Sequence, residues 1–306
     1  MTSMLRNSFL LLFASATGLT GCAAAQTLTR PDPAGDYHLE FKDLDNTQRS
    51  MTLEATDLIS PTISVSVAQS GGSWTYTYTL SNSNTGKART GRGVWLWKAA
   101  CGSRGSSVTP TAPTPWRPQA RDLGNSKICE FQLPTSAPLL DPGMSASGFS
   151  IASSALPMVG LVRVFGSADV PNWPVETDRI APRVLAVADS VAGLSYWDHS
   201  GAEVYTLLPL RNPDSVTSGA GATALLKGDL ATACAQLGWI TNQGVCKSLD
   251  AKLNAAQASF THGQADAGKQ QLLAFLNELS AQRDKGVSQN AFDLLSSLVA
   301  FTLSHF

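Results

Sequence analysis

Charged and imidazole side chains are scarce in this 306-residue sequence. Lys, Arg, Asp and Glu make up 15% of the residues, and the formal net charge is −1. Lys and Arg form no basic stripe, so nucleic-acid binding has no electrostatic support. The imidazoles are limited to His38, His199, His262 and His305, which leaves little material for acid–base catalysis.

Motifs that carry catalysis are also missing. Nucleophilic hydrolysis needs an activated Ser or Cys beside a base, and no Gly-x-Ser-x-Gly elbow is present. An acid, an imidazole and a hydroxyl are adjacent only in Asp198-His199-Ser200, where neighbouring side chains point apart, so we expect a polar turn. Gly219-Ala220-Gly221 lacks the Gly and Lys that a phosphate loop would place after it. We therefore expect no enzyme; an exported hydrolase with scattered catalytic residues is the alternative.

Metal-binding patterns are missing as well. The five cysteines show no Cys-x-x-Cys or Cys/His spacing, which argues against zinc. Asp43 and Asp45 come nearest to a calcium loop, but we expect a solvated loop there. No metal or cofactor is expected, and after the leader no apolar run reaches the length that spans a membrane.

The N-terminal residues follow the pattern of an export signal. Arg6 supplies a positive charge, and the uncharged stretch from Ser8 to Ala16 follows it. This apolar stretch is too short to span a bilayer, which takes about 20 residues. Residues 1–21 are therefore predicted to be a signal peptide.

Leu19-Thr20-Gly21-Cys22 resembles the lipobox of bacterial lipoproteins. The resemblance implies that the Cys22 thiol is acylated and that cleavage occurs before Cys22. It also implies a lipid bilayer as partner, with the protein exported and anchored to the cell envelope, at the outer membrane or facing the periplasm. Two or three acyl chains would hold the protein stably. The alternative is cleavage after Ala23-Ala24-Ala25, which would release a soluble protein that starts at Gln26.

The cysteine count agrees with lipidation of Cys22. Removing it leaves an even set, which we expect to form disulfides in an oxidising compartment: Cys101, Cys129, Cys234 and Cys246. Four cysteines allow three pairings. The sequential pairing, Cys101–Cys129 with Cys234–Cys246, keeps each bridge within one predicted domain.

Residues 22–36 are polar and rich in proline, and are predicted to be a tether. From Tyr37 the hydrophobic period is two. Strands are predicted on both sides of Gly71-Gly72 as a hairpin, and then at 94–97, 128–133, 146–153, 159–165 and 184–187. Short strands separated by Gly, Pro, Ser and Asn predict an antiparallel sandwich over residues 37–210.

Part of this region resembles a β-sandwich module of uncharacterised secreted bacterial proteins. The similarity lies in the stretches 75–82, Asp141-Pro142-Gly143 and Ser147-Gly148-Phe149-Ser150, and covers residues 61–165. It implies a fold and an exported protein, and it carries no catalytic residue.

Residues 211–224 have the composition of a linker, and the period then becomes helical over 225–306. A first helix is predicted at 226–237. Leu249, Leu253, Ala256 and Phe260 form the stripe of a second helix, and Ser288 is a candidate N-cap of the last. The expected fold class is an all-β, antiparallel, Ig-like sandwich followed by a small all-α helical bundle.

The helical part resembles the FIMAH-type module that is appended to bacterial secreted and surface proteins. The similarity lies in Gly238-Trp239-Ile240, Ser248-Leu249, Lys252-Leu253, Ala256, Gly263 and Lys285-Gly286-Val287-Ser288, and covers residues 225–304. It implies an accessory module with no reaction attached to it.

Two tryptophans are the candidate binding residues. Trp116 lies in Thr114-Pro115-Trp116-Arg117-Pro118, and Trp173 lies in Pro171-Asn172-Trp173-Pro174. A proline-stiffened loop that exposes an indole offers a surface for a sugar or a protein partner at low entropic cost; the alternative is that each ring folds back over the sandwich. The sequence thus predicts a membrane-anchored envelope lipoprotein that is a non-enzymatic binding or structural module for a polysaccharide or an envelope protein.

Overall fold

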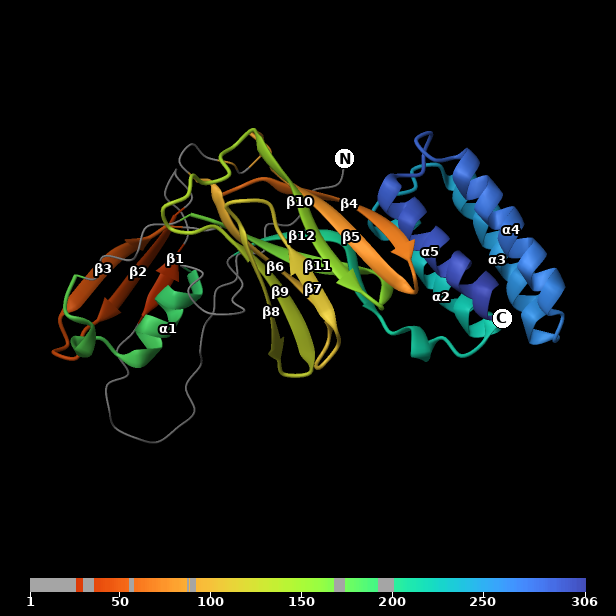
Figure 1. Ribbon diagram of the computed structural model, residues 1–306. Helices are drawn as coiled ribbons and strands as arrows, with labels where there is room; N and C mark the ends of the chain where they lie inside the picture. The colour runs from red at the N-terminus through yellow and green to blue at the C-terminus, as the bar shows by residue number, and fades with distance from the viewer. Residues whose placement is uncertain are drawn as a thin grey trace.

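A computed structural model describes residues 26–29, 36–54, 58–86, 88, 92–167, 174–191 and 201–306. Cys22, Trp173 and His199 lie outside the described residues. Three parts follow one another in space, as Figure 1 shows. We call them the N-terminal sheet unit (β1–β3 with α1), the sandwich body (β4–β12) and the helical module (α2–α5).

The N-terminal sheet unit has a small hydrophobic core of its own. Its antiparallel strands are β1 (Thr27–Thr29), β2 (Tyr37–Lys42) and β3 (Gln48–Leu53), and α1 (Pro182–Val191) packs against β2. Alternate residues of β2 and β3 point inward, because side chains of a strand alternate between its two faces. The core consists of Leu39, Phe41, Met51, Leu53, Ile180, Val184 and Ala188.

Three sequence predictions are corrected by this unit. The predicted tether, 22–36, contains strand β1, which pairs with β2. The predicted strand at 184–187 is part of α1, where Val184 and Ala188 bury one face at the helical spacing of four residues. The predicted sandwich, 37–210, therefore includes a separate sheet unit and a helix, because a four-residue apolar run does not distinguish a strand from a buried helix segment.

The sandwich body consists of two antiparallel sheets, so the prediction of an antiparallel sandwich-like fold is confirmed. One sheet has the order β4-β5-β10-β7 and the other β12-β11-β6-β9-β8. The strands are β4 (Pro61–Ser70), β5 (Ser73–Asn82), β6 (Val94–Ser103), β7 (Val108–Thr111), β8 (Arg117–Leu123), β9 (Ser126–Gln132), β10 (Met144–Ser153), β11 (Leu156–Gly166) and β12 (Ala202–Arg211). β4 lies beside β12 on one side of the body, and β7 lies beside β8 on the other.

The predicted hairpin around Gly71-Gly72 is confirmed. Both glycines have positive φ, 57° and 80°, and this left-handed pair gives a two-residue turn whose twist matches the flanking strands. Alternate residues of β5 then point into the core, and Trp74, Tyr76, Tyr78 and Leu80 are at most 4% exposed.

Aromatic rings fill the centre of the sandwich body. Trp97 stacks on Phe131 with 4.1 Å between ring centroids, and meets Tyr78 and Phe149 edge-on. Burial raises the pKa of Tyr78, whose hydroxyl donates to the carbonyl of Leu207 in the opposite sheet at 3.0 Å. The two sheets are thus joined by packing and by a buried hydrogen bond.

Four α-helices form the helical module: α2 (Gly219–Ala231), α3 (Gln243–Thr261), α4 (Ala265–Ala281) and α5 (Gln289–His305). The predicted N-cap is confirmed, because the Ser288 hydroxyl accepts from the backbone N–H of Ala291. The predicted linker, 211–224, is shorter than expected. Arg211 ends β12, the 3-10 helix η2 (Pro213–Ser215) follows, and α2 begins at Gly219 with Ser218 as its N-cap. Among the described helices, none is both long and apolar enough to cross a membrane.

The helical module and the sandwich body share one continuous hydrophobic core. Helix α5 packs against β4, β11 and β12, and Figure 1 shows it beside the end of β4. β4 and β12 are edge strands, and covering an edge with a helix protects its unpaired backbone groups.

Candidate functional site

Trp116 does not form the exposed surface that its loop suggested. It is 7% exposed, and its ring meets that of Phe149 edge-on at 5.1 Å. Trp116 is therefore a core residue of the sandwich body, and the alternative that its ring folds back holds. Trp173, the other candidate, lies outside the described residues.

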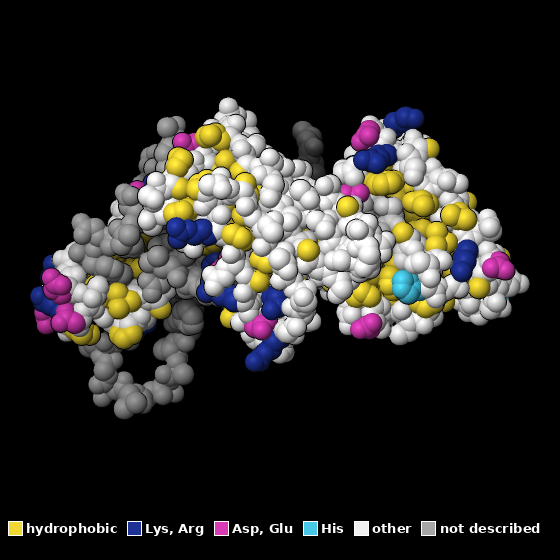
Figure 2. Space-filling view, in the orientation of Figure 1, with side chains coloured by type: hydrophobic (Ala, Val, Ile, Leu, Met, Phe, Trp, Pro, Cys, Tyr) yellow, Lys and Arg dark blue, Asp and Glu magenta, His cyan; other side chains and the backbone are white. Residues whose placement is uncertain are grey.

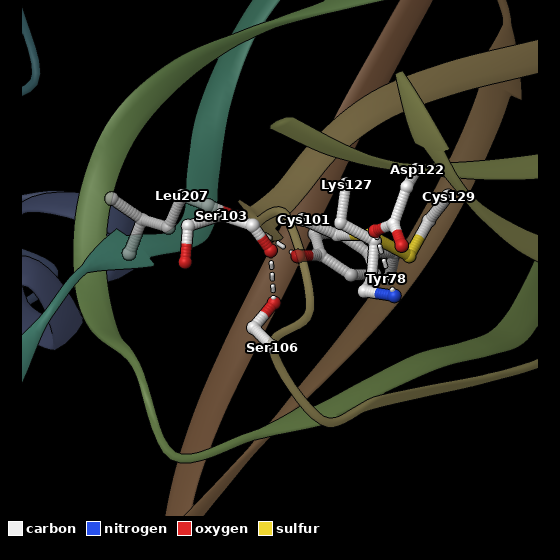
Figure 3. The surroundings of a disulfide bond; sticks show 8 residues. All are labelled: Tyr78, Cys101, Ser103, Ser106, Asp122, Lys127, Cys129 and Leu207. Carbon is white, nitrogen blue, oxygen red and sulfur yellow. Dashed lines mark hydrogen bonds and ion pairs between the residues drawn. A yellow bond between two sulfur atoms is a disulfide. The ribbon is translucent and has the colours of Figure 1, made fainter. Parts of the chain in front are cut away.

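Both predicted disulfides are present. Cys101 and Cys129 join neighbouring strands β6 and β9, with 5.8 Å between their Cα atoms, and Cys234 and Cys246 join residues of the helical module. Figure 3 shows Tyr78 next to the first bridge. Each bridge lies within one part of the molecule, as the sequential pairing requires.

The loop at Asp43 and Asp45 is solvated, as expected, because residues 44–48 are exposed, but Asp43 itself is buried. Asp43 is 3% exposed, and its carboxylate accepts the N–H groups of Asp45 and Thr47 and a side-chain N–H of Arg49. Burial raises the pKa of Asp43, but these hydrogen bonds outweigh burial and leave the pKa below its usual value. The carboxylate serves to close a turn. Across the described part of the chain, no group of three or more His, Cys, Asp or Glu is placed to hold a metal ion.

Two buried polar contacts fix the helical module on the sandwich body. The guanidinium of Arg211, at the end of β12, lies 2.8 Å from both carboxylate oxygens of Asp229 in α2. On α5, Asp293 accepts the backbone N–H of Val67 from edge strand β4 at 3.1 Å. Burial raises the pKa of Asp229 and of Asp293, and their hydrogen bonds oppose the shift. A buried polar contact of this kind requires one defined orientation of the helical module relative to the sandwich body.

A pocket of about 300 Å³ opens beside this junction, where four segments that are distant in the sequence meet. In the β4–β5 hairpin, Trp74 pairs in register with Gln69 of β4 and with Ser153 of β10. Trp74 is the first inward-facing residue of β5, so the pocket lies where the aromatic core of the sandwich reaches its end. Trp74 is 4% exposed and lines the pocket.

Hydrogen bonds hold two of the other walls in place. Ser154 lies in the turn between β10 and β11, and the Tyr76 hydroxyl fixes that turn by donating to the carbonyl of Ala155 at 2.7 Å. Asn212 caps η2 by accepting the N–H of Asp214, and thereby places Asp214 at the pocket. Both walls are anchored to the sandwich body.

The last turn of α5 supplies the fourth wall. The His305 ring stacks on Phe301 at 4.0 Å, and His305 Nδ1 lies 2.8 Å from the Phe301 carbonyl. A carbonyl oxygen only accepts, so in the neutral ring Nδ1 carries the proton and Nε2 is left as an acceptor. The pocket thus combines two aromatic rings, a carboxylate, an imidazole and neutral polar groups.

The sequence does not predict this pocket, since Asp214 lies within the predicted linker, 211–224, and His305 stands out only as one of four imidazoles. The i, i+4 spacing of Phe301 and His305 places both on one helix face, and Pro213 marks a fixed turn before α2. Neither signal identifies the other segments that line the pocket.

A second, smaller pocket of about 210 Å³ lies at the Cys234–Cys246 bridge and is lined by Lys227, Lys247 and Asp250 among others. Its charges are mixed. Figure 2 shows Lys and Arg scattered among Asp and Glu over the visible face, with no extended patch of one sign. The surface in view thus shows no electrostatic preference for a highly charged partner.

Comparison with known proteins identifies the helical module. Residues 228–301 match the model of the FIMAH domain, which confirms the resemblance expected for the C-terminal helices. The match covers α3, α4, most of α5 and only the last turn of α2, from residue 228. No curated protein matches the chain.

Proposed function

We propose that this protein is a lipid-anchored lipoprotein of the cell envelope that binds a polysaccharide without catalysing a reaction. In this proposal the sandwich body is an Ig-like β-sandwich, and the helical module is a small bundle that works as part of the same binding body. The supporting observation is the shared core, together with the contacts Arg211–Asp229 and Asp293–Val67. A rigid body that contributes both of its parts to one pocket suits recognition, since little conformational entropy is lost on binding.

The anchor is tested by mass spectrometry of the mature N-terminus in the native host. The expected result is a chain that begins at an acylated Cys22, and Cys22→Ser is expected to move the protein from the membrane to the soluble fraction. An unmodified chain that starts at Gln26 would refute the anchor.

Binding is tested by sedimentation of the full chain with insoluble envelope polysaccharide purified from the host. The expected result is co-sedimentation that persists after the polysaccharide has been stripped of protein. A parallel screen for esterase, protease and glycosidase activity tests the absence of catalysis, and turnover that is lost in His199→Ala would refute a purely binding role.

A further inference from the structure

We infer that the pocket at the junction of the sandwich body and the helical module binds one neutral sugar residue of such a polysaccharide. This inference rests on the proposed function and adds the location of the site and the chemical class of its ligand.

The charge of the pocket argues against anionic ligands. Asp214 is the only Lys, Arg, Asp or Glu side chain among its lining residues, and no described residue forms an ion pair with it. The last turn of α5 also lies here, and the unpaired carbonyls at a helix C-terminus add partial negative charge. A uronic acid or a phosphate would meet repulsion from Asp214, with no Lys or Arg in the lining to offset it.

The arrangement of apolar and polar groups matches the two-sided character of a pyranose. Such a ring has C–H groups on its faces and hydroxyls around its rim. Trp74 and Phe301 supply aromatic carbon to the lining of the pocket, where they are 4% and 8% exposed, and the His305 ring covers one face of Phe301. Gln69, Asn212 and Asp214 supply exposed amide and carboxylate groups. An aromatic surface favours the C–H face, while the planar polar groups can accept from hydroxyls on the rim.

Hydrogen-bonding capacity remains for a ligand. The indole N–H of Trp74 has no hydrogen-bond partner among the described residues, and it is not one of the polar atoms that are fully shielded from solvent. In the neutral ring with its proton on Nδ1, His305 Nε2 is an acceptor. The Asp214 carboxylate has no side-chain hydrogen bond or ion pair with the described residues. A sugar hydroxyl, which both donates and accepts, can satisfy such a mixed set.

The size of the site fits a single residue of a chain. A pocket of about 300 Å³ is at the lower limit of volumes that enclose small molecules. It is also open to solvent on one side, as Gly72, Ser154 and Asp214 are exposed, so a polymer can enter with one residue and continue outside.

The test is isothermal titration calorimetry of the detergent-solubilised full chain with three neutral trisaccharides: maltotriose, cellotriose and tri-N-acetylchitotriose. Trigalacturonate and 1,6-diaminohexane serve as anionic and cationic probes. The variants are Asp214→Ala and His305→Ala. Their matched controls are Asp266→Ala, at another exposed aspartate in the first turn of a helix, and His262→Ala, at another exposed histidine at a helix end. Thermal unfolding followed by circular dichroism verifies that each variant folds.

We expect one neutral trisaccharide to bind, each pocket variant to weaken it by about tenfold or more, and the controls to leave it unchanged. Binding that is insensitive to Asp214 and His305 would overturn the site but leave the proposed polysaccharide binding intact. Binding of trigalacturonate or of the diamine in place of the neutral sugars would overturn the ligand class. If no probe binds while the stripped polysaccharide still co-sediments, the sugar-residue pocket is wrong and the proposed function stands. If no probe binds and the polysaccharide does not co-sediment, the pocket and the proposed function are both wrong.

Discussion

Phe260 in α3 is wedged between two glycines of the neighbouring helices, and this contact can be tested with a single methyl group. A Cβ added at Gly219 in α2 would lie 2.4 Å from Cδ1 of the ring, and one added at Gly268 in α4 would lie 2.8 Å from Cδ2 on its other side. Because both edges of the ring are in contact, the ring cannot swing away from either methyl. We predict that Gly268→Ala and Gly219→Ala both destabilise the protein.

The magnitude follows from two opposing effects. Replacing Gly by Ala inside a helix stabilises it by roughly 0.5–1 kcal/mol, because the unfolded chain loses conformational freedom. Forcing an additional carbon into a packed contact costs about 1–3 kcal/mol. Gly228 in α2 is the matched control, since a Cβ there meets nothing within 4 Å. Gly228→Ala should therefore stabilise by about 0.5–1 kcal/mol, and Gly268→Ala should lie about 1–3 kcal/mol below it.

Urea unfolding followed by far-ultraviolet circular dichroism measures these differences, since the helices dominate the signal. A double-mutant cycle with Phe260→Ala separates packing from helix propensity. Without the ring, Gly268→Ala should become as stabilising as Gly228→Ala. If Gly268→Ala stabilises the protein that still carries Phe260, the wedge does not exist and the helix packing described above is wrong.

Three further predictions concern the core and the junction. Trp116→Ala should cost about 3–5 kcal/mol of stability, because the indole packs on Phe149, and an unchanged urea midpoint would contradict its burial. Asp229→Ala leaves Arg211 buried without a partner and should also cost about 3–5 kcal/mol of stability. The double variant Arg211→Met with Asp229→Leu should recover most of that stability. Equal losses in the single and the double variant would contradict the ion pair. Burial raises the pKa of Asp293, so the folded state holds this proton more tightly than the unfolded state, and stability is lost as pH rises from about 4 through the raised pKa. Asp293→Asn should flatten this part of the profile of unfolding free energy against pH, and a profile that keeps its slope would argue against the burial of Asp293.

Features set by neighbouring residues were readable from the sequence. The two glycines of the β4–β5 turn, the Ser288 cap and the alternation along β5 each depend on a few consecutive residues, and each was predicted. The disulfides followed from parity and from keeping each bridge within one domain. α1 was not readable, since the partners of Val184 lie on strands more than a hundred residues earlier.

The candidate site depends on contacts that no local pattern encodes. The prolines around Trp116 predict a stiff loop, but the direction of the indole is set by Phe149 from another strand. The junction pocket joins a hairpin, a strand turn, the η2 segment and the end of α5. Asp214 and His305 are ordinary surface residues by sequence, and they line one pocket only because α5 packs against β4.

The position of the pocket bears on what the FIMAH match means for this chain. The match ends at Phe301, so it includes one aromatic ring of the pocket but not His305, Asp214 or the sandwich residues. The same helices joined to a different body would lack three of the four walls. Under the proposal, ligand specificity therefore belongs to the combination of the sandwich body and the helical module. The Asp293–Val67 and Arg211–Asp229 contacts join these two parts, so the proposed site depends on them as well as on the residues that line it.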